Sequence, residues 1–183
     1  MKRAKILLLI SIALMLVSMI AVSVIQTDGG KVTMKELFVE TDDGIGQSSY
    51  LFIPSTATPN NPAPAIVTSH GLFNNKEMQD ANFVELARRG FVVLAIDQAN
   101  HGNSDLAGTN GIETPYNNGV YEGAVILSRL PYVDKNRIGV TGHSMGGMSC
   151  NVAVATDEAL GTNLISSVLL NCADAVYTDG PPP

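Results

Sequence analysis

The sequence is poor in several residue types, and each scarcity excludes a class of protein. Basic residues are outnumbered, with 11 Lys and Arg against 17 Asp and Glu, which gives a formal net charge of -6. Because no stretch gathers positive charge into a stripe, no nucleic-acid partner is expected. The two cysteines and three histidines show no metal-ligand spacing, so neither a metal nor a cofactor is expected. No internal repeat is present, which excludes a repeat architecture.

What the sequence does contain is typical of one globular domain behind an apolar leader. The 183 residues suffice for a single domain with a sizeable core, and 45% of them are hydrophobic against 15% charged. We divide the chain into an N-terminal segment at 1–25, a short linker at 26–34 and a domain at 35–183.

The N-terminal segment has the length of a membrane span. Residues 6–25 carry no charge, and twenty helical residues at about 1.5 Å each match a hydrocarbon core of about 30 Å. Lys2, Arg3 and Lys5 precede this run and are expected to stay in the cytoplasm, which places the domain outside. A signal peptide cleaved near Ala21-Val22-Ser23 is the main alternative, and a buried soluble helix is a third. The two leading interpretations both export the domain, as a single-pass anchored or a secreted protein.

Strands and helices are expected to alternate along the domain. Residues 35–41 and 48–54 flank a turn and predict an antiparallel hairpin. Buried parallel strands are predicted at 65–70, 91–97, 137–142 and 166–174. Helices are predicted at 76–89, after Pro115 with Thr114 as its cap, and after residue 144. This alternation predicts an α/β fold: a mostly parallel, doubly wound sheet with an antiparallel N-terminal hairpin.

The segment "RIGVTGHSMGGMSC" (residues 137–150) contains the clearest chemical motif. Gly142 and Gly146 lie two residues before and after Ser144, between a predicted strand and a predicted helix. A sharp strand-to-helix turn projects a serine hydroxyl clear of the backbone, and the helix N-terminus supplies N–H donors to a developing oxyanion. The crowding at such a turn requires small residues at those spacings, and Gly147 would ease the approach of the helix to the sheet. Ser144 is therefore predicted to be a nucleophile.

These motifs make the chain resemble the α/β-hydrolase family over about residues 35–174. Within the family, "VDKNRIGVTGHSMGG" is similar to dienelactone-hydrolase-like and acyl-peptidase-like serine esterases. The segment "SHGLFNNK" resembles the family's His-Gly oxyanion segment after the third strand. The resemblance implies that the backbone N–H groups of Leu72 and Met145 form the oxyanion hole, and that His70 and Gly71 are structural residues of that loop.

The segment "DQANHGNSD" resembles the family's Asp-x-Arg-Gly-His-Gly-x-Ser loop after the fourth strand. Asp97 and His101 fit the pattern, whereas Ala99 and Asn100 stand where Arg and Gly are usual. The resemblance implies that this loop shapes the site from the side and is not part of the catalytic triad.

The partners that Ser144 needs are only partly present. A triad serine requires an imidazole and an orienting acid, in the chain order Ser, acid, His in this fold. Asp174, at the end of the last predicted strand, is a candidate acid, but no histidine follows Ser144. Since the family usually adds two more strands, we expect this chain to be part of a longer protein or a truncated product, without full triad activity by itself.

Three functions remain open from the sequence. The first is an extracytoplasmic serine hydrolase acting on an ester, thioester or amide of a small molecule or peptide, anchored in the membrane through residues 6–25. The second is a non-catalytic or degenerate binding domain, and the third is an acyltransferase that uses the same serine. Cys150 and Cys172 can form a disulfide in an exported domain, although two buried thiols are the simpler expectation because each lies in an apolar element.

Overall fold

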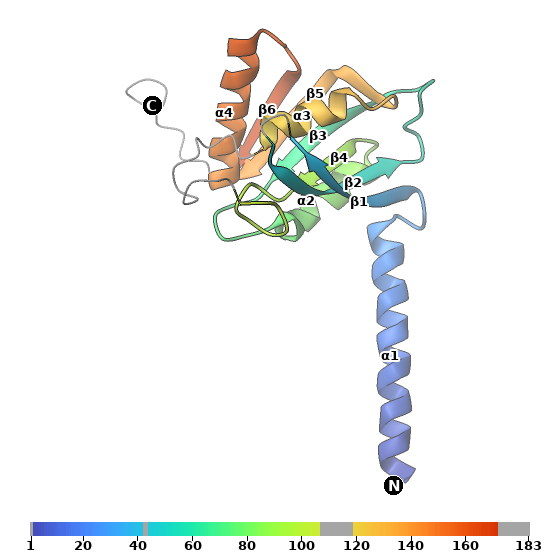
Figure 1. Ribbon diagram of the computed structural model, residues 1–183. Helices are drawn as coiled ribbons and strands as arrows, with labels where there is room; N and C mark the ends of the chain where they lie inside the picture. The colour runs from blue at the N-terminus through green and yellow to red at the C-terminus, as the bar shows by residue number, and fades with distance from the viewer. Residues whose placement is uncertain (1, 42–43, 107–118, 172–183) are drawn as a thin grey trace.

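One mixed six-stranded sheet, with helices on both faces, forms the body of the protein (Figure 1). The computed structural model describes residues 2–41, 44–106 and 119–171. The strand order is β1-β2-β4-β3-β5-β6. In chain order the elements are α1 (Lys2–Gln26), β1 (Val32–Glu40), β2 (Gly46–Pro54), β3 (Ala63–Ser69), the 3-10 helix η1 (Lys76–Gln79), α2 (Asp80–Arg88), β4 (Val92–Ile96), α3 (Val120–Ser128), β5 (Val133–His143), α4 (Met145–Leu160) and β6 (Ile165–Asn171).

The predicted antiparallel hairpin and parallel strands are both confirmed. β1 pairs antiparallel with β2, and β2 pairs antiparallel with β4, whereas β4, β3, β5 and β6 run parallel. The hairpin begins earlier than expected, at Val32 inside the predicted linker. Val32 is buried and pairs with Pro54 of β2, a partner 22 positions away that the local sequence does not reveal.

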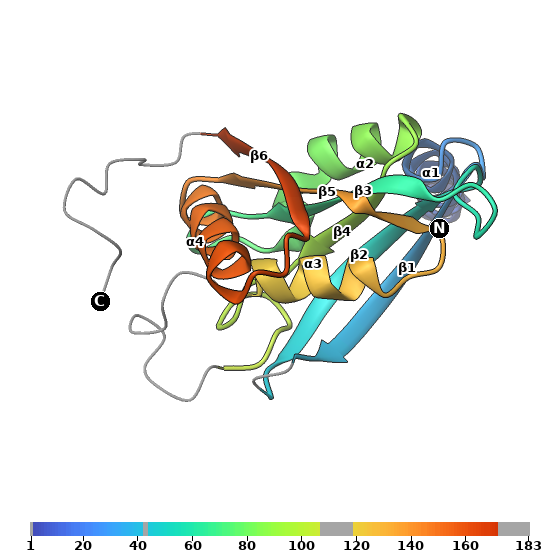
Figure 2. The ribbon, with the colours of Figure 1, turned by 90° about the horizontal axis from the view of Figure 1, so that it is seen from above.

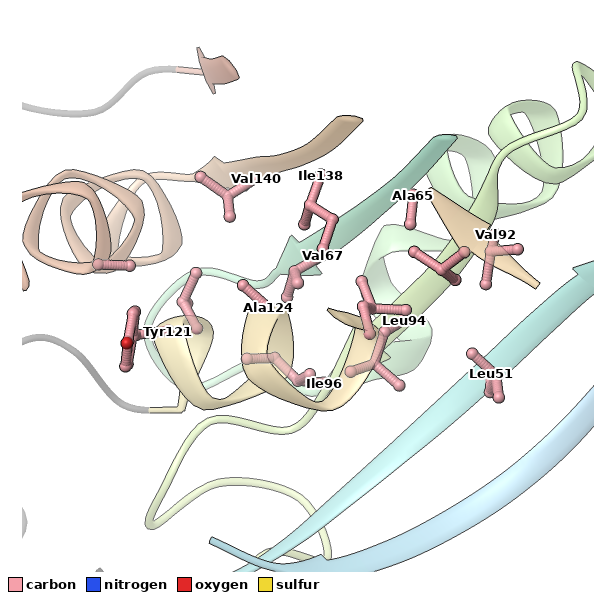
Figure 3. Close-up of a cluster of buried hydrophobic side chains, with 14 of the residues drawn as sticks. Leu51, Ala65, Val67, Val92, Leu94, Ile96, Tyr121, Ala124, Ile138 and Val140 are labelled. Atoms are coloured by element: carbon pink, nitrogen blue, oxygen red, sulfur yellow. The ribbon is translucent and has the colours of Figure 1, made fainter. Parts of the chain in front are cut away.

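The helices form two layers, so the doubly wound arrangement is confirmed. α2 covers one face of the sheet, and α3 and α4 cover the other (Figure 2). The side chains of β4 alternate between the two faces: Leu94 packs in the cluster under α3 and α4, and Val93 packs in the cluster under α2. Figure 3 shows the larger cluster, in which Ala124 of α3 lies beside Val67 and Leu94. All five residues of β4 are buried, which is the reason for their uninterrupted apolar sequence.

Helix α1 projects away from this body (Figure 1). Its stretch Arg3–Gln26 is long and apolar enough to cross a membrane, and none of its most apolar window is buried against the rest of the protein. The same properties are shared by N-terminal signal sequences. At its end, Arg88 of α2 donates a hydrogen bond to the carbonyl of Ile25.

Some expectations fall outside the described residues. The predicted helix start at Thr114 and Pro115 lies there, and so do Cys172 and Asp174. The described part of that helix is α3, in which Val120, Ala124 and Leu127 are fully buried, as their helical spacing predicts.

The parallel strands direct three loops to one edge of the sheet. β3, β4 and β5 all end there, at Ser69, Ile96 and His143. Ligands of open α/β sheets bind outside the carboxyl ends of the strands. The residues that the sequence singles out follow these three strands directly.

Candidate active site

Ser144 is the single residue between β5 and α4. Its backbone has φ 53° and ψ -118°, and a positive φ is uncommon for a residue with a side chain. The strained conformation expected of a nucleophile turn is therefore present. The carbonyl of Ser144 accepts hydrogen bonds from the N–H groups of Gly147 and Met148, which start the first turn of α4.

The flanking glycines are required by close backbone contacts. A Cβ atom on Gly142 would lie under 3.0 Å from the carbonyl oxygen of Gly146. A Cβ atom on Gly146 would lie equally close to the carbonyl oxygens of Ser69 and His70, at the end of β3. Since backbone atoms cannot move aside as a flexible side chain can, only glycine fits at either position. The turn also brings the start of α4 directly against the segment that follows β3.

The segment after β3 is fixed by the His70 side chain. His70 is fully buried, its Nδ1 lies 2.8 Å from the Gly71 carbonyl oxygen, and the Gln98 N–H donates to its Nε2 at 3.1 Å. Because Nε2 accepts a hydrogen bond, the ring proton resides on Nδ1 and is donated to Gly71. Burial lowers the pKa of His70 below 6.5, which favours this neutral form. The structural role expected of His70 and Gly71 is consistent with this geometry.

Two backbone N–H groups are available where the sequence places the oxyanion hole. Leu72 follows the fixed Gly71 and is half exposed, and Met145 is the first residue of α4. Among the described residues, no hydrogen bond uses the N–H of Leu72 or of Met145. Donors at a helix N-terminus and a tight loop suit the stabilisation of a developing negative charge.

The Asp97 carboxylate organises the loop after β4. Its Oδ2 accepts bonds from the Lys76 Nζ at 2.7 Å and the Asn103 N–H at 3.0 Å, and its Oδ1 accepts the Lys76 N–H at 2.7 Å. The side chains of Asp97 and Lys76 are almost completely buried. A Cβ atom on Gly102 would overlap the carboxylate. Asp97 is thus held by the loops on both sides, in agreement with the structural role that the resemblance implies.

The sequence did not predict that Lys76 is a buried residue of this site. It stands at the start of a polar helical stretch, where a lysine is normally exposed. Its Nζ instead reaches the Ser48 Oγ at 3.1 Å and lies 4.7 Å from the centre of the Tyr50 ring. Both contacts are made by β2, and no local pattern connects them to residue 76.

Two of the three histidines, His70 and His101, have hydrogen-bond partners other than Ser144. The Nδ1 of His101 donates to the Ala99 carbonyl at 3.0 Å, and its ring lies 5.2 Å from that of His70. His143 lies close enough that a Cβ atom on Gly71 would contact its ring at 3.4 Å. Within the described ranges, none of these rings is hydrogen-bonded to the Ser144 hydroxyl.

Cys150 is excluded as an alternative nucleophile. The side chain is fully buried in the cluster under α4, and its thiol is free. Burial raises the pKa of Cys150 to about 12, so almost no thiolate exists at neutral pH. The expectation of a buried thiol is confirmed at this position.

The chain thus combines a mostly parallel, helix-covered sheet with a serine of positive φ at the turn from β5 to α4. Residues 64–182 match the model of the alpha/beta hydrolase fold family, and the chain belongs to this family.

Several bacterial proteins match over most of this chain. It is 31% identical over 128 residues to the uncharacterized protein YcjY of Escherichia coli, covering 68% of this chain and 42% of YcjY. It is 27% identical over 135 residues to the quorum-quenching protein AidA of Acinetobacter baumannii, covering 73% of this chain and 41% of AidA. The crystal structure of the hypothetical protein PA2218 of Pseudomonas aeruginosa superposes with a TM-score of 0.65 and 29% identity, covering 78% of this chain and 43% of that one. The chain therefore spans less than half the length of these relatives.

Proposed function

We propose that this chain carries the nucleophile and the oxyanion hole of a serine hydrolase that acts on a carboxylic ester, thioester or amide. The observation that carries the proposal is the strained backbone of Ser144 at the junction of β5 and α4, beside two N–H groups without intramolecular partners in the described chain. Membership of the alpha/beta hydrolase fold family supports the same chemistry.

The reaction would proceed through an acyl-enzyme. The Ser144 oxygen attacks the substrate carbonyl while an imidazole accepts its proton, and the Leu72 and Met145 N–H groups stabilise the tetrahedral oxyanion. The leaving group departs with that proton, and water then releases the acyl group. Because His70 and His101 are held by other contacts, and no hydrogen bond joins His143 to the Ser144 hydroxyl among the described residues, we assign the imidazole to sequence outside residues 1–183. Asp174 remains a candidate for the orienting acid and lies outside the described residues.

The location we propose is the outer side of a membrane. Helix α1 supports this assignment by its length, its apolar sequence and its separation from the sheet. Arg3 and Lys5 lie at its N-terminal end, and positive residues favour the cytoplasmic side. The domain would then follow on the outer side, either anchored by α1 or released if α1 is cleaved.

Substitution of Ser144 tests the proposed function. In the protein produced from its natural reading frame, Ser144→Ala should lower the hydrolysis of a p-nitrophenyl ester by at least about 10³-fold. Cys150→Ala, which removes the buried thiol six residues later, is the matched control and should keep the activity. Equal hydrolysis by wild type and Ser144→Ala would contradict a serine nucleophile.

A non-catalytic binding role is the second candidate, and the engagement of His70 and His101 by other partners favours it. Its signature would be a natural reading frame that supplies no histidine after β6, together with a protein that hydrolyses no ester. If hydrolysis is found, an added alcohol as acceptor would distinguish an acyltransferase, which forms a new ester, from a hydrolase, which forms the free acid.

A further inference from the structure

Gln98 is a buried polar residue that the sequence motifs do not explain. It follows β4 by two positions and is 0% exposed, and a buried amide is costly unless its groups are hydrogen-bonded. In the family's loop pattern this position is unspecified. Two hydrogen-bond partners of Gln98, His70 and Ser149, lie on other segments, and each of these segments leads to a proposed oxyanion donor.

The first connection runs to the segment after β3. The Gln98 N–H donates to the His70 Nε2, and the Gln98 side-chain amide donates to the His70 carbonyl. His70 in turn donates from Nδ1 to the carbonyl of Gly71. That carbonyl and the N–H of Leu72 belong to one planar trans peptide and point in opposite directions. Holding the Gly71 oxygen on one side therefore directs the Leu72 N–H to the other.

The second connection runs to the first turn of α4. The Ser149 hydroxyl lies 2.9 Å from the Gln98 Oε1 and 3.1 Å from the carbonyl oxygen of Met145. Since an amide oxygen only accepts, Ser149 is the donor in its bond to Gln98. Ser149 stands one turn after Met145, so this bond ties Gln98 to the turn that presents the Met145 N–H.

The two connections meet where the backbones are already in contact. Gly146 of α4 lies against the carbonyls of Ser69 and His70 so closely that no Cβ atom fits between them. The Gln98 side chain, which follows β4, bridges the same two segments through its hydrogen bonds to His70 and Ser149.

We propose that Gln98 is a positioning residue, which sets the distance and the relative direction of the Leu72 and Met145 N–H groups. It acts through its hydrogen bonds to His70 and Ser149. The inference rests on the proposed function, because the two N–H groups matter only if an oxyanion forms between them.

The test is a pair of substitutions in the protein produced from its natural reading frame, assayed with a p-nitrophenyl ester. Gln98→Met keeps the length of the side chain but loses both amide hydrogen bonds. Because oxyanion donors act on the transition state, kcat should fall by about 10- to 100-fold while KM changes by less than about 2-fold. Gln47→Met is the matched control: Gln47 is also buried, and its amide donates to Gly119, away from the oxyanion donors. Its kcat should stay that of the wild type.

Gln98→Glu adds a pH signature that a loss of packing would not produce. A protonated glutamate can donate to the His70 carbonyl and accept from Ser149, as the amide does, whereas the carboxylate cannot donate. Burial raises the pKa of such a group. The kcat of Gln98→Glu relative to wild type should therefore be near one at pH 5 and fall at least about 10-fold by pH 8. This variant decides the question alone if Gln98→Met does not fold.

The outcomes separate the positioning role from the proposed function. If Ser144→Ala hydrolyses the ester like wild type, both are wrong. If Ser144→Ala is inactive but Gln98→Met keeps kcat within 2-fold, or Gln47→Met loses as much as Gln98→Met, only the positioning role is wrong. A pH-independent activity ratio for Gln98→Glu would also overturn it.

Discussion

The central strands and the outer strand β6 have similarly apolar sequences but very different surroundings. Every residue of β4 is buried between two layers of helices, whereas Leu169 of β6 is 67% exposed and Val168 is 43% exposed. An apolar run in the sequence therefore predicts a strand, but it does not predict whether helices cover the two faces of that strand. The buried polar residues of the site, Asp97 and Gln98, lie where coverage is complete, and there each is hydrogen-bonded.

The difference has a chemical consequence. Leaving a polar group of the covered region unpaired is costly, since water does not reach it, and the pairing of Asp97 and Gln98 holds the loops in fixed positions. The connection from α4 to β6 is instead held by one carboxylate, that of Asp157. This carboxylate accepts hydrogen bonds from the N–H groups of Leu164 and Ile165. Substitutions in the two regions should therefore differ strongly in their cost.

The largest loss is expected in the covered region, from Lys76→Met. It would leave the Asp97 carboxylate buried without its cation, and breaking a buried ion pair costs about 3–5 kcal/mol of unfolding free energy. Urea unfolding of the detergent-solubilised protein measures this loss. The double variant Lys76→Met/Asp97→Asn should recover part of it, because no buried charge remains unpaired. A loss under about 1 kcal/mol in the single variant would show that Asp97 does not need its partner.

An intermediate and pH-dependent loss is expected at the crossover, from Asp157→Asn. Burial alone would raise the pKa of Asp157, but hydrogen bonds from Thr162, Leu164 and Ile165 outweigh it and lower the pKa below 3.8. The stabilisation by the carboxylate is thus fully present above pH 3.8 and is lost as the pH falls from 3.8 through the lowered native pKa. At pH 7 the variant should lose about 1.5–3 kcal/mol, the range for hydrogen bonds to charged groups.

The control for this prediction is Asp134→Asn. The pKa of Asp134 is also lowered, first by its hydrogen bond from Arg137, but this ion pair lies at the surface, with the side chains of Asp134 28% and Arg137 56% exposed, and should contribute little to stability. Unfolding curves between pH 2 and 7 should show the difference between wild type and Asp157→Asn closing below pH 3.8. A difference that is constant over this range would refute the assigned role of the charge.

In the 183-residue chain, the smallest effect on stability is expected at the outer strand, from Leu169→Lys. Exposed positions change the unfolding free energy by about 0.5 kcal/mol or less. The added charge should also reduce self-association along this strand, measured by sedimentation. Val140→Lys, which places the same residue on the neighbouring strand at a buried position, should prevent folding. If Leu169→Lys is as damaging as Val140→Lys, the face of β6 is covered and the comparison fails.

The sequence predicted those features that depend on residues close together in the chain. The strained turn at Ser144, the glycines around it and the hairpin follow from local spacing. Features that depend on distant partners were missed. Lys76 pairs with a carboxylate 21 positions later, and Gln98 reaches His70 and Ser149 on two other elements. In such cases the residue type even misleads, because Lys and Gln normally indicate an exposed position.

The most direct test of the account is to map the residue that reacts with a fluorophosphonate probe. The protein produced from its natural reading frame is treated with the probe, digested, and examined by mass spectrometry. The account predicts one phosphonylated peptide, modified at Ser144, and no labelling of the Ser144→Ala variant. Equal labelling of the two proteins, or modification of another residue, would contradict Ser144 as the nucleophile.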